Sequence, residues 1–276
     1  MAKNRNEEQM ARFLGPIVWS RRVDTPGESE PPSPLTPDLP RQFGSKINWF
    51  AIKTVDVQSV AEALGLTGLR PSNWSNGIED ACQSSPEHPI TVFVSPPVEG
   101  WTFVVGAGLP YPADSDRNGG NLPFGKRFRT LFGELSRRFE EVQFFGSDRV
   151  VDFSAWARAH NGQAIRVFSY VGAQGEVLAN EGGQTPEERA LGLIDPGSRN
   201  PADATDYLCE QEEALMDGEG EVTDADEDDS DGVTPKAFPD EDDVIDLAGR
   251  WSLNPYELEA LNPEPALGWL AELKRE

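Results

Sequence analysis

The stretch 142–170 holds the residues whose types best suit recognition chemistry. Asp148 and Arg149 form a charged pair, and Trp156 and Arg166 follow in the same stretch. An arginine placed above an aromatic ring is a common way of binding a ligand or a partner. The same side chains would equally form an ion pair and a ring contact that fix a helix to a sheet. The residue types alone leave both interpretations open.

The two histidines, His88 and His160, are the candidates for acid–base catalysis. His88 precedes Pro89 in a loop without a motif, and His160 ends an expected helix, where the helix dipole alone favours an imidazolium. The chain has no GxSxG or P-loop motif and no Cys/His spacing typical of zinc. We therefore expect no catalytic residue, no metal site and no cofactor. The candidate binding residues are Trp74, Trp101, Asp148, Arg149, Trp156, His160 and Arg166.

The acidic run DADEDDSDG at 224–232 suggests calcium binding. An EF-hand loop requires Gly at position 6 and a bidentate Glu at position 12. With Gly232 at position 6, position 12 is Phe238, so the closing ligand is missing. The run instead predicts a solvated acidic linker.

Around the central residues, the sequence predicts a strand, a helix and a second strand. The aromatic run 142–145 indicates the first strand. Asp152 is placed to cap the helix and Gly162 to end it. Four residues at helical spacing form its expected apolar face: Phe153, Trp156, Ala157 and His160. In the closing strand, Arg166, Phe168 and Tyr170 are expected to share one face.

The remaining patterns complete an expected α+β domain. They indicate a strand near 47–53, a helix near 56–64, a loop at 72–80, a hairpin at 90–106, a helix at 124–139, a return strand at 177–178 and a helix starting at Thr185. Because hairpins make antiparallel pairs, we expect a mostly antiparallel sheet with helices packed largely on one face. A ferredoxin-like arrangement and its doubled form both fit this order.

Composition divides the chain into four expected segments. Residues 1–45 read as a disordered Pro-rich tail, 46–194 as the globular domain, 195–239 as an acidic disordered linker and 240–276 as a helical hairpin. The net charge is −24, and residues 201–243 hold 18 acidic residues against one base, which leaves −7 for the rest. A mildly acidic domain with a strongly acidic strap is expected.

Charge and hydropathy exclude several classes of partner. An acidic surface repels phosphate backbones, so nucleic-acid binding is disfavoured. No apolar run approaches the length of a membrane span, and the N-terminus has no apolar core of a signal peptide. Cys82 and Cys209 are far apart in sequence. A disulfide is therefore not expected, and the chain is typical of a reducing cytoplasm.

Residues 47–192 resemble a family of uncharacterised bacterial proteins. The pieces that carry this resemblance are INWFAIKT, NWSNGIE, VFVSPPVEGWTFVVG, VQFFGSDRVVDFSAWARAHNGQAIRVFSYVGAQGE and NEGGQTPEERALG, with DVIDLAGRWSLNPYELE near the C-terminus. In that family a His often precedes the central Arg, where this chain has Asp148. The difference argues against an acid–base role at that position, and the family implies no reaction.

The C-terminal segment VIDLAGRWSLNPYELEALNP is similar to the helical half of a LysM repeat, a carbohydrate-binding module. A complete module also needs a strand on each side, and residues 264–276 do not read as one. We expect instead a helical hairpin that docks on the main domain or on a partner.

These observations predict a non-catalytic cytoplasmic bacterial protein that acts by protein–protein binding. Neutralisation of a basic toxin by an immunity-like protein is one example, because acidic charge speeds association with a basic partner. The alternative is a small-molecule-binding or enzymatic domain with a pocket around Arg149, Trp156 and Arg166. A deep pocket joining Arg149, Arg166 and Trp101 would support this alternative.

Overall fold

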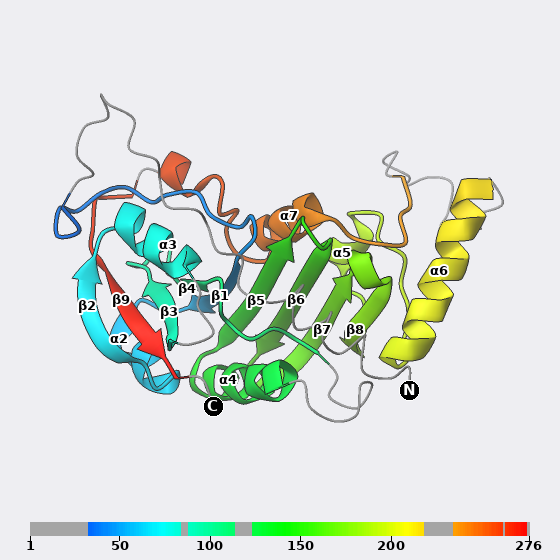
Figure 1. Ribbon diagram of the computed structural model, residues 1–276, viewed down its shortest axis with the longest axis horizontal. Helices are drawn as coiled ribbons and strands as arrows, with labels where there is room; N and C mark the ends of the chain where they lie inside the picture. The colour runs from blue at the N-terminus through cyan, green and yellow to red at the C-terminus, as the bar shows by residue number, and fades with distance from the viewer. Residues whose placement is uncertain (1–32, 84–87, 114–122, 218–233, 262, 275–276) are drawn as a thin grey trace, which may run out of the picture.

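The computed structural model describes residues 33–83, 88–113, 123–217, 234–261 and 263–274. These residues form one antiparallel sheet with helices packed against it (Figure 1). The expected α+β class and antiparallel sheet are therefore confirmed.

The sheet has nine strands within the described residues, in the order β2-β9-β3-β4-β1-β5-β6-β7-β8. Their bounds are β1 Asn48–Lys53, β2 Thr67–Ser72, β3 Ile90–Val94, β4 Trp101–Gly106, β5 Glu141–Asp148, β6 Phe153–His160, β7 Gln163–Val171, β8 Glu176–Gly182 and β9 Gly268–Leu273. The strands β5 to β8 follow one another as a meander, because each is joined to the next by a short turn.

One face of the sheet is covered by α2 (Val57–Ala63) and α4 (Pro123–Arg138). The apolar stripe of α4 packs on Phe50 and Phe144 of the central strands, as the helical spacing predicts. Asp56 caps α2 by accepting the Ser59 N–H at 3.0 Å, as expected. The local sequence was sufficient to predict α2 and α4, because both helices have a clear amphipathic period.

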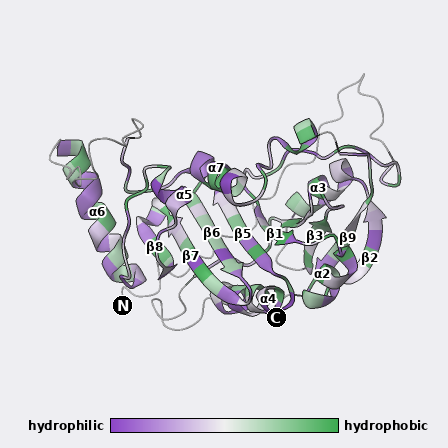
Figure 2. Ribbon diagram, turned by 180° about the vertical axis from the view of Figure 1, so that it is seen from behind, coloured by the Kyte–Doolittle hydropathy of each residue, from purple (hydrophilic) through white to green (hydrophobic). Residues whose placement is uncertain are grey.

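The opposite face is covered by α3 (Trp74–Cys82), α5 (Pro186–Arg189) and α7 (Glu241–Trp251), and α6 (Pro201–Asp217) lies beside the edge strand β8 (Figures 1 and 2). Helices thus lie on both faces, whereas we expected them largely on one. The reason is that the sheet buries apolar side chains on both sides, including Phe50 on one and Trp49 on the other. Each face then needs its own cover.

The expected helix over 153–160 is wrong, because these residues form β6. Phe153 and the alanines at 155, 157 and 159 point to the face of α4, while Trp156 points to the other face. This alternation has a period of two, whereas the expected helix rested on Phe153, Trp156, Ala157 and His160, whose spacing also fits a helical period. Asp152 and Asn161 have φ of 49° each and lie in the turns at the two ends, so Asp152 does not cap a helix.

Two segments that we expected to be irregular are ordered parts of the fold. The expected loop at 72–80 contains α3, which Asn73 caps by accepting the Asn76 N–H at 3.0 Å. Residues 33–38 of the expected tail contact the start of this helix, where the Asp38 carboxylate accepts the N–H groups of Trp74 and Ser75 at 2.7 and 3.0 Å. Asn73 is a local cap that the sequence analysis assigned to a loop, whereas the contact with Asp38 comes from a distant segment that the local sequence does not reveal.

The C-terminal segment is also different from the expected helical hairpin. After α7 and the short 3-10 helix η2 (Leu258–Leu261), the chain forms β9, which pairs with β2 on one side and β3 on the other. Likewise α6 occupies residues 201–217 of the expected linker. The acidic run 224–232, residues 1–32 and most of the loop after Ala113 lie outside the described residues.

Candidate functional site

Two rows of side chains cross strands β5, β6 and β7 on the face that α5 and α7 cover. In the first row Phe145, Trp156 and Phe168 are cross-strand neighbours, and the last two rings stack with centroids 4.8 Å apart. In the second row Gln143, Arg158 and Arg166 are cross-strand neighbours. We call this second row, with the three carboxylates that pair with it (Glu141, Glu187 and Glu188), the polar row.

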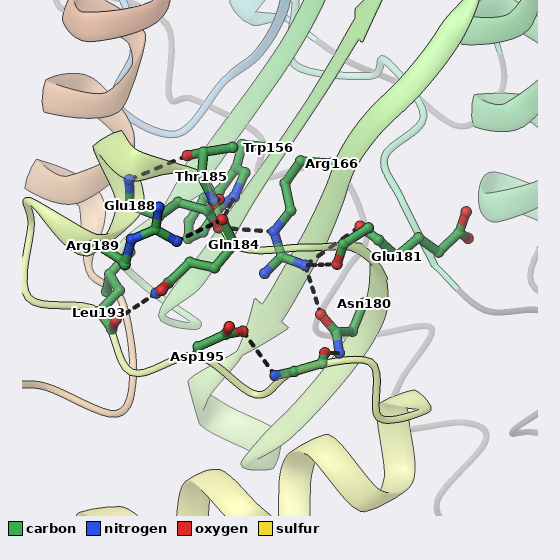
Figure 3. A network of polar contacts seen from close by, with 12 residues as sticks. Trp156, Arg166, Asn180, Glu181, Gln184, Thr185, Glu188, Arg189, Leu193 and Asp195 are labelled. Atoms are coloured by element: carbon green, nitrogen blue, oxygen red, sulfur yellow. Dashed lines mark hydrogen bonds and ion pairs between the residues drawn. The ribbon is translucent and has the colours of Figure 1, made fainter. Parts of the chain in front are cut away.

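Arg166 is the most deeply buried cation of the polar row, with only 2% of the residue exposed. Its Nε donates to Glu188 Oε1 at 2.9 Å, and its Nη1 donates to Asn180 Oδ1 at 2.7 Å (Figure 3). Asn180 in turn donates to the carbonyls of Gly197 and Arg199 at 3.0 and 2.8 Å. A buried guanidinium needs such a set of acceptors, because an unpaired charge in this position is costly.

Glu188 joins three elements through one carboxylate. Thr185 and Glu188 form a capping box at the start of α5, with Glu188 Oε2 accepting the Thr185 N–H at 2.7 Å. Glu188 Oε1 accepts both Arg166 Nε and Trp156 Nε1 at 2.9 Å (Figure 3). The helix start at Thr185 is as expected, and the same glutamate also binds the arginine and the tryptophan of the sheet.

Arg158 lies at the more open end of the polar row, with its side chain 25% exposed. Its Nη2 lies 2.9 Å from Glu141 Oε1, and its guanidinium carbon lies 5.5 Å from the Trp251 ring centre. Gln143 Oε1 and Trp251 Nε1 are buried here without a hydrogen-bond partner among the described residues. An acceptor and a donor left in this way mark positions where a bound water would be stabilised.

The structure brings together only some of the predicted site residues. Trp156 and Arg166 meet through Glu188, whereas Arg149 is exposed in the turn after β5. Asp148 supports that turn by accepting the Val150 N–H at 3.0 Å. His160 lies at the outer end of the polar row, with Nδ1 3.9 Å from Glu141 Oε2.

The other two predicted residues, Trp74 and Trp101, lie apart from the polar row. Trp74 is buried in α3, where its ring makes an edge contact with Phe93 at 5.4 Å. Trp101 lies on β4 beneath Lys53, whose Nζ is 4.8 Å from the ring centre. Both side chains lie in the core, which is consistent with a role in packing rather than in binding.

A surface that the sequence analysis missed lies on α6. Five exposed carboxylates follow one side of this helix at intervals of three and four residues: Asp203, Asp206, Glu210, Glu213 and Asp217. We call them the acidic stripe. The 3.6-residue period was visible in the sequence, but the high charge of the whole segment indicated a linker instead.

Metal binding and thiol chemistry receive no support from the described residues. Within these ranges no three His, Cys, Asp or Glu side chains lie close enough together to hold a metal ion. Cys82 and Cys209 are free, and burial raises the pKa of the Cys82 thiol to about 11. A thiol with so high a pKa is a weak nucleophile at neutral pH.

None of the helices described has the length and apolar character needed to cross a lipid bilayer.

No family model, no curated protein and no solved structure matches this chain. The two resemblances drawn from the sequence, to a bacterial family and to the LysM helices, therefore stay predictions.

Proposed function

We propose that this protein acts without catalysis by binding a basic protein partner, and that the acidic stripe of α6 is the binding surface. The observation that carries the proposal is the regular exposure of five carboxylates along one side of a single helix. No basic residue of α6 offsets them.

The attachment of α6 to the sheet supports this role. Ala204 and Leu208 are buried against the body, and Thr205 Oγ1 accepts the Val177 N–H of β8 at 2.9 Å. The helix is thus held at the outer edge of the sheet (Figure 2), and the five carboxylates of the acidic stripe are exposed. A preformed surface loses less conformational entropy on binding than a flexible acidic segment does.

Charge and exposed apolar surface fit a protein partner better than a nucleic acid. The net charge of −24 repels phosphate and attracts a cationic protein over a distance. Met216, near the end of the acidic stripe, is 76% exposed and offers an adaptable apolar contact. Neutralisation of a basic toxin or nuclease in the bacterial cytoplasm is the specific function that we propose to test.

The test uses the full-length chain as bait in its native host, followed by binding measurements with the purified partner. One variant replaces the five carboxylates of the acidic stripe by amides. The matched control replaces five others that follow α6 in the sequence, at Glu219, Glu221, Asp224, Asp226 and Glu227. We expect a basic partner whose association rate falls at least about tenfold with the stripe variant, falls much less with the control, and decreases with salt. Equal losses for both variants, or binding that neither weakens, would contradict the proposal.

A further inference from the structure

A cavity of about 200 Å³ lies between α4 and the strands β7 and β8, on the face opposite the polar row. Its walls come from three parts of the fold: Pro112 and Ala113 after β4, the side of α4, and the far end of the meander. An apolar cavity of about 150 Å³ is known to hold a benzene ring. The volume is therefore sufficient for an aromatic ring or a short alkyl chain.

The inner wall of this cavity is apolar and firmly packed. Phe128 and Phe132 of α4 stack with centroids 5.3 Å apart, and Val167 and Ala179 are buried in the sheet opposite them. The space exists because Gly133, Gly162 and Ala164 line the cavity with little or no side chain. Such small residues leave the atoms that line the cavity without contacts, and an apolar ligand group placed there would gain van der Waals contact with them.

The mouth of the cavity carries a cation. Arg129 of α4 and Glu181 of β8 both line it, and Arg129 Nη2 lies 2.7 Å from Glu181 Oε1. The two side chains are 47% and 51% exposed, so this ion pair is exchangeable with solvent or with a ligand. Nη2 is the atom of Arg129 that takes part in this pair.

The helix that carries Arg129 is basic in an otherwise acidic protein. Lys126, Arg127, Arg137 and Arg138 lie on the same helix, and Glu134 is its only acidic residue. Arg137 pairs with Glu134 and Arg138 with Glu62, whereas Lys126 and Arg127 lie within one turn of Arg129 and add positive potential beside it. A carboxylate is one of the anions that a guanidinium binds with two parallel hydrogen bonds, and a carboxylate already occupies this position in the pair with Glu181.

We propose that this cavity binds a small amphipathic carboxylate, an aryl or short alkyl acid, with its apolar part between α4 and β7–β8 and its carboxylate on Arg129. This activity is separate from the binding of a protein by α6, because none of the cavity residues belongs to that helix.

The test measures binding of phenylacetate and hexanoate to the full chain by calorimetry and by the shift in melting temperature. We expect dissociation constants of about millimolar or tighter, as the size of such ligands allows. Arg129→Gln should weaken binding at least about tenfold, which is the effect of losing a charge-assisted contact. Arg137→Gln is the matched control on the same helix, outside the cavity lining, and should change binding less than about twofold.

A second variant tests the cavity itself. Gly133→Leu places a side chain into the open space, where a Cβ meets no described atom within 4 Å. This variant should fold with an unchanged or raised melting temperature and should no longer bind either acid. Failure of both acids to bind the wild type would overturn the proposal. So would binding that Gly133→Leu or Arg129→Gln leaves unchanged, or preferential binding of phenethylamine or toluene.

Discussion

Arg158 of β6 and Arg166 of β7 lie directly opposite each other, so their two guanidinium groups share one face of the sheet. Like charges in such a pair are destabilising when nothing offsets them. Glu188 pairs with Arg166 at 2.9 Å, and Glu141 pairs with Arg158 at 2.9 Å. Glu188 of α5 thus neutralises the buried Arg166 of the sheet, and the same ion pair holds α5 on the sheet.

Replacement of Glu188 by glutamine should strongly destabilise the protein. The change removes the charge that pairs with Arg166 and leaves a guanidinium buried without a counterion. Breaking a buried pair in this way costs about 3–5 kcal/mol of the free energy of unfolding, which urea denaturation measures.

Glu187→Gln is the matched control for this variant. Glu187 is the neighbouring residue in α5, but its side chain is 31% exposed and lies 3.9 Å from Arg158 Nη1. The expected loss is at most about 1 kcal/mol. If the two variants were equally stable, the pairing of Glu188 with Arg166 would not be what holds α5 on the sheet.

Asp38→Ala should destabilise α3, although Asp38 lies far from that helix in sequence. Its carboxylate accepts two N–H groups of the first turn and the Ser75 hydroxyl at 2.6 Å. The loss of such a cap costs about 1–2 kcal/mol. Thermal unfolding followed by circular dichroism measures the change. Glu79→Ala, an exposed position in the same helix, should change stability by no more than about 0.5 kcal/mol. A loss at Asp38 no larger than this would show that the Asp38 carboxylate does not stabilise α3.

The parts of the fold that the sequence predicted are those with local signals. The caps at Asp56 and Thr185 and the apolar stripe of α4 each lie within a few residues of the helix that they define. Strand β9 was not predicted, because both of its partners, β2 and β3, lie far from it in the sequence, before residue 95. Such pairing depends on which edges the rest of the sheet leaves open, and a single segment does not carry that information.

In the candidate site, too, the residues with a local sequence signal were predicted and the contacts that depend on long-range packing were not. Trp156 and Arg166, both named as candidates from the sequence, meet through Glu188, and the alternation along β7 was as expected. Glu188 was missed as their partner, because its role in the capping box of α5 already accounted for a glutamate at this position. A carboxylate has two oxygens, however, and in this structure one caps α5 while the other accepts from the sheet. Only the packing of α5 against β6 and β7 reveals the second role.

Two helical glycines should respond to alanine in opposite directions. A Cβ on Gly77 of α3 would lie 2.1 Å from Phe93 Cδ2, and that ring is fully buried. A Cβ on Gly133 of α4 meets nothing within 4 Å among the described atoms. Gly77→Ala should therefore cost about 1–3 kcal/mol through overpacking, and Gly133→Ala should add about 0.5–1 kcal/mol through helix propensity. Urea denaturation of the two variants in parallel tests the close packing of α3 on β3, which an increase in stability for Gly77→Ala would contradict.

The stability of the protein should fall at high pH, in part because of Tyr111. Burial raises the pKa of Tyr111 to about 12, whereas an exposed tyrosine titrates near pH 10. The unfolded chain therefore loses this proton first as the pH rises. The contribution of Tyr111 to stability is fully present below about pH 10 and is lost as the pH rises to about 12. A difference of about two pKa units corresponds to about 2.7 kcal/mol.

Tyr111→Phe isolates this contribution, because phenylalanine keeps the edge contact with Phe153, whose ring lies 4.8 Å away, and cannot ionise. Urea denaturation between about pH 9 and 12 should show a shallower fall in the free energy of unfolding for the variant than for the wild type. Some fall should remain in the variant, since burial also raises the pKa of Tyr170 to about 12 and that of Cys82 to about 11. Tyr170→Phe should produce a reduction of its own, and the double variant should show nearly the sum of both, because the two rings lie in separate cores on opposite faces of the sheet. Parallel curves for the wild type and Tyr111→Phe would mean that Tyr111 ionises equally easily in the folded and unfolded chain.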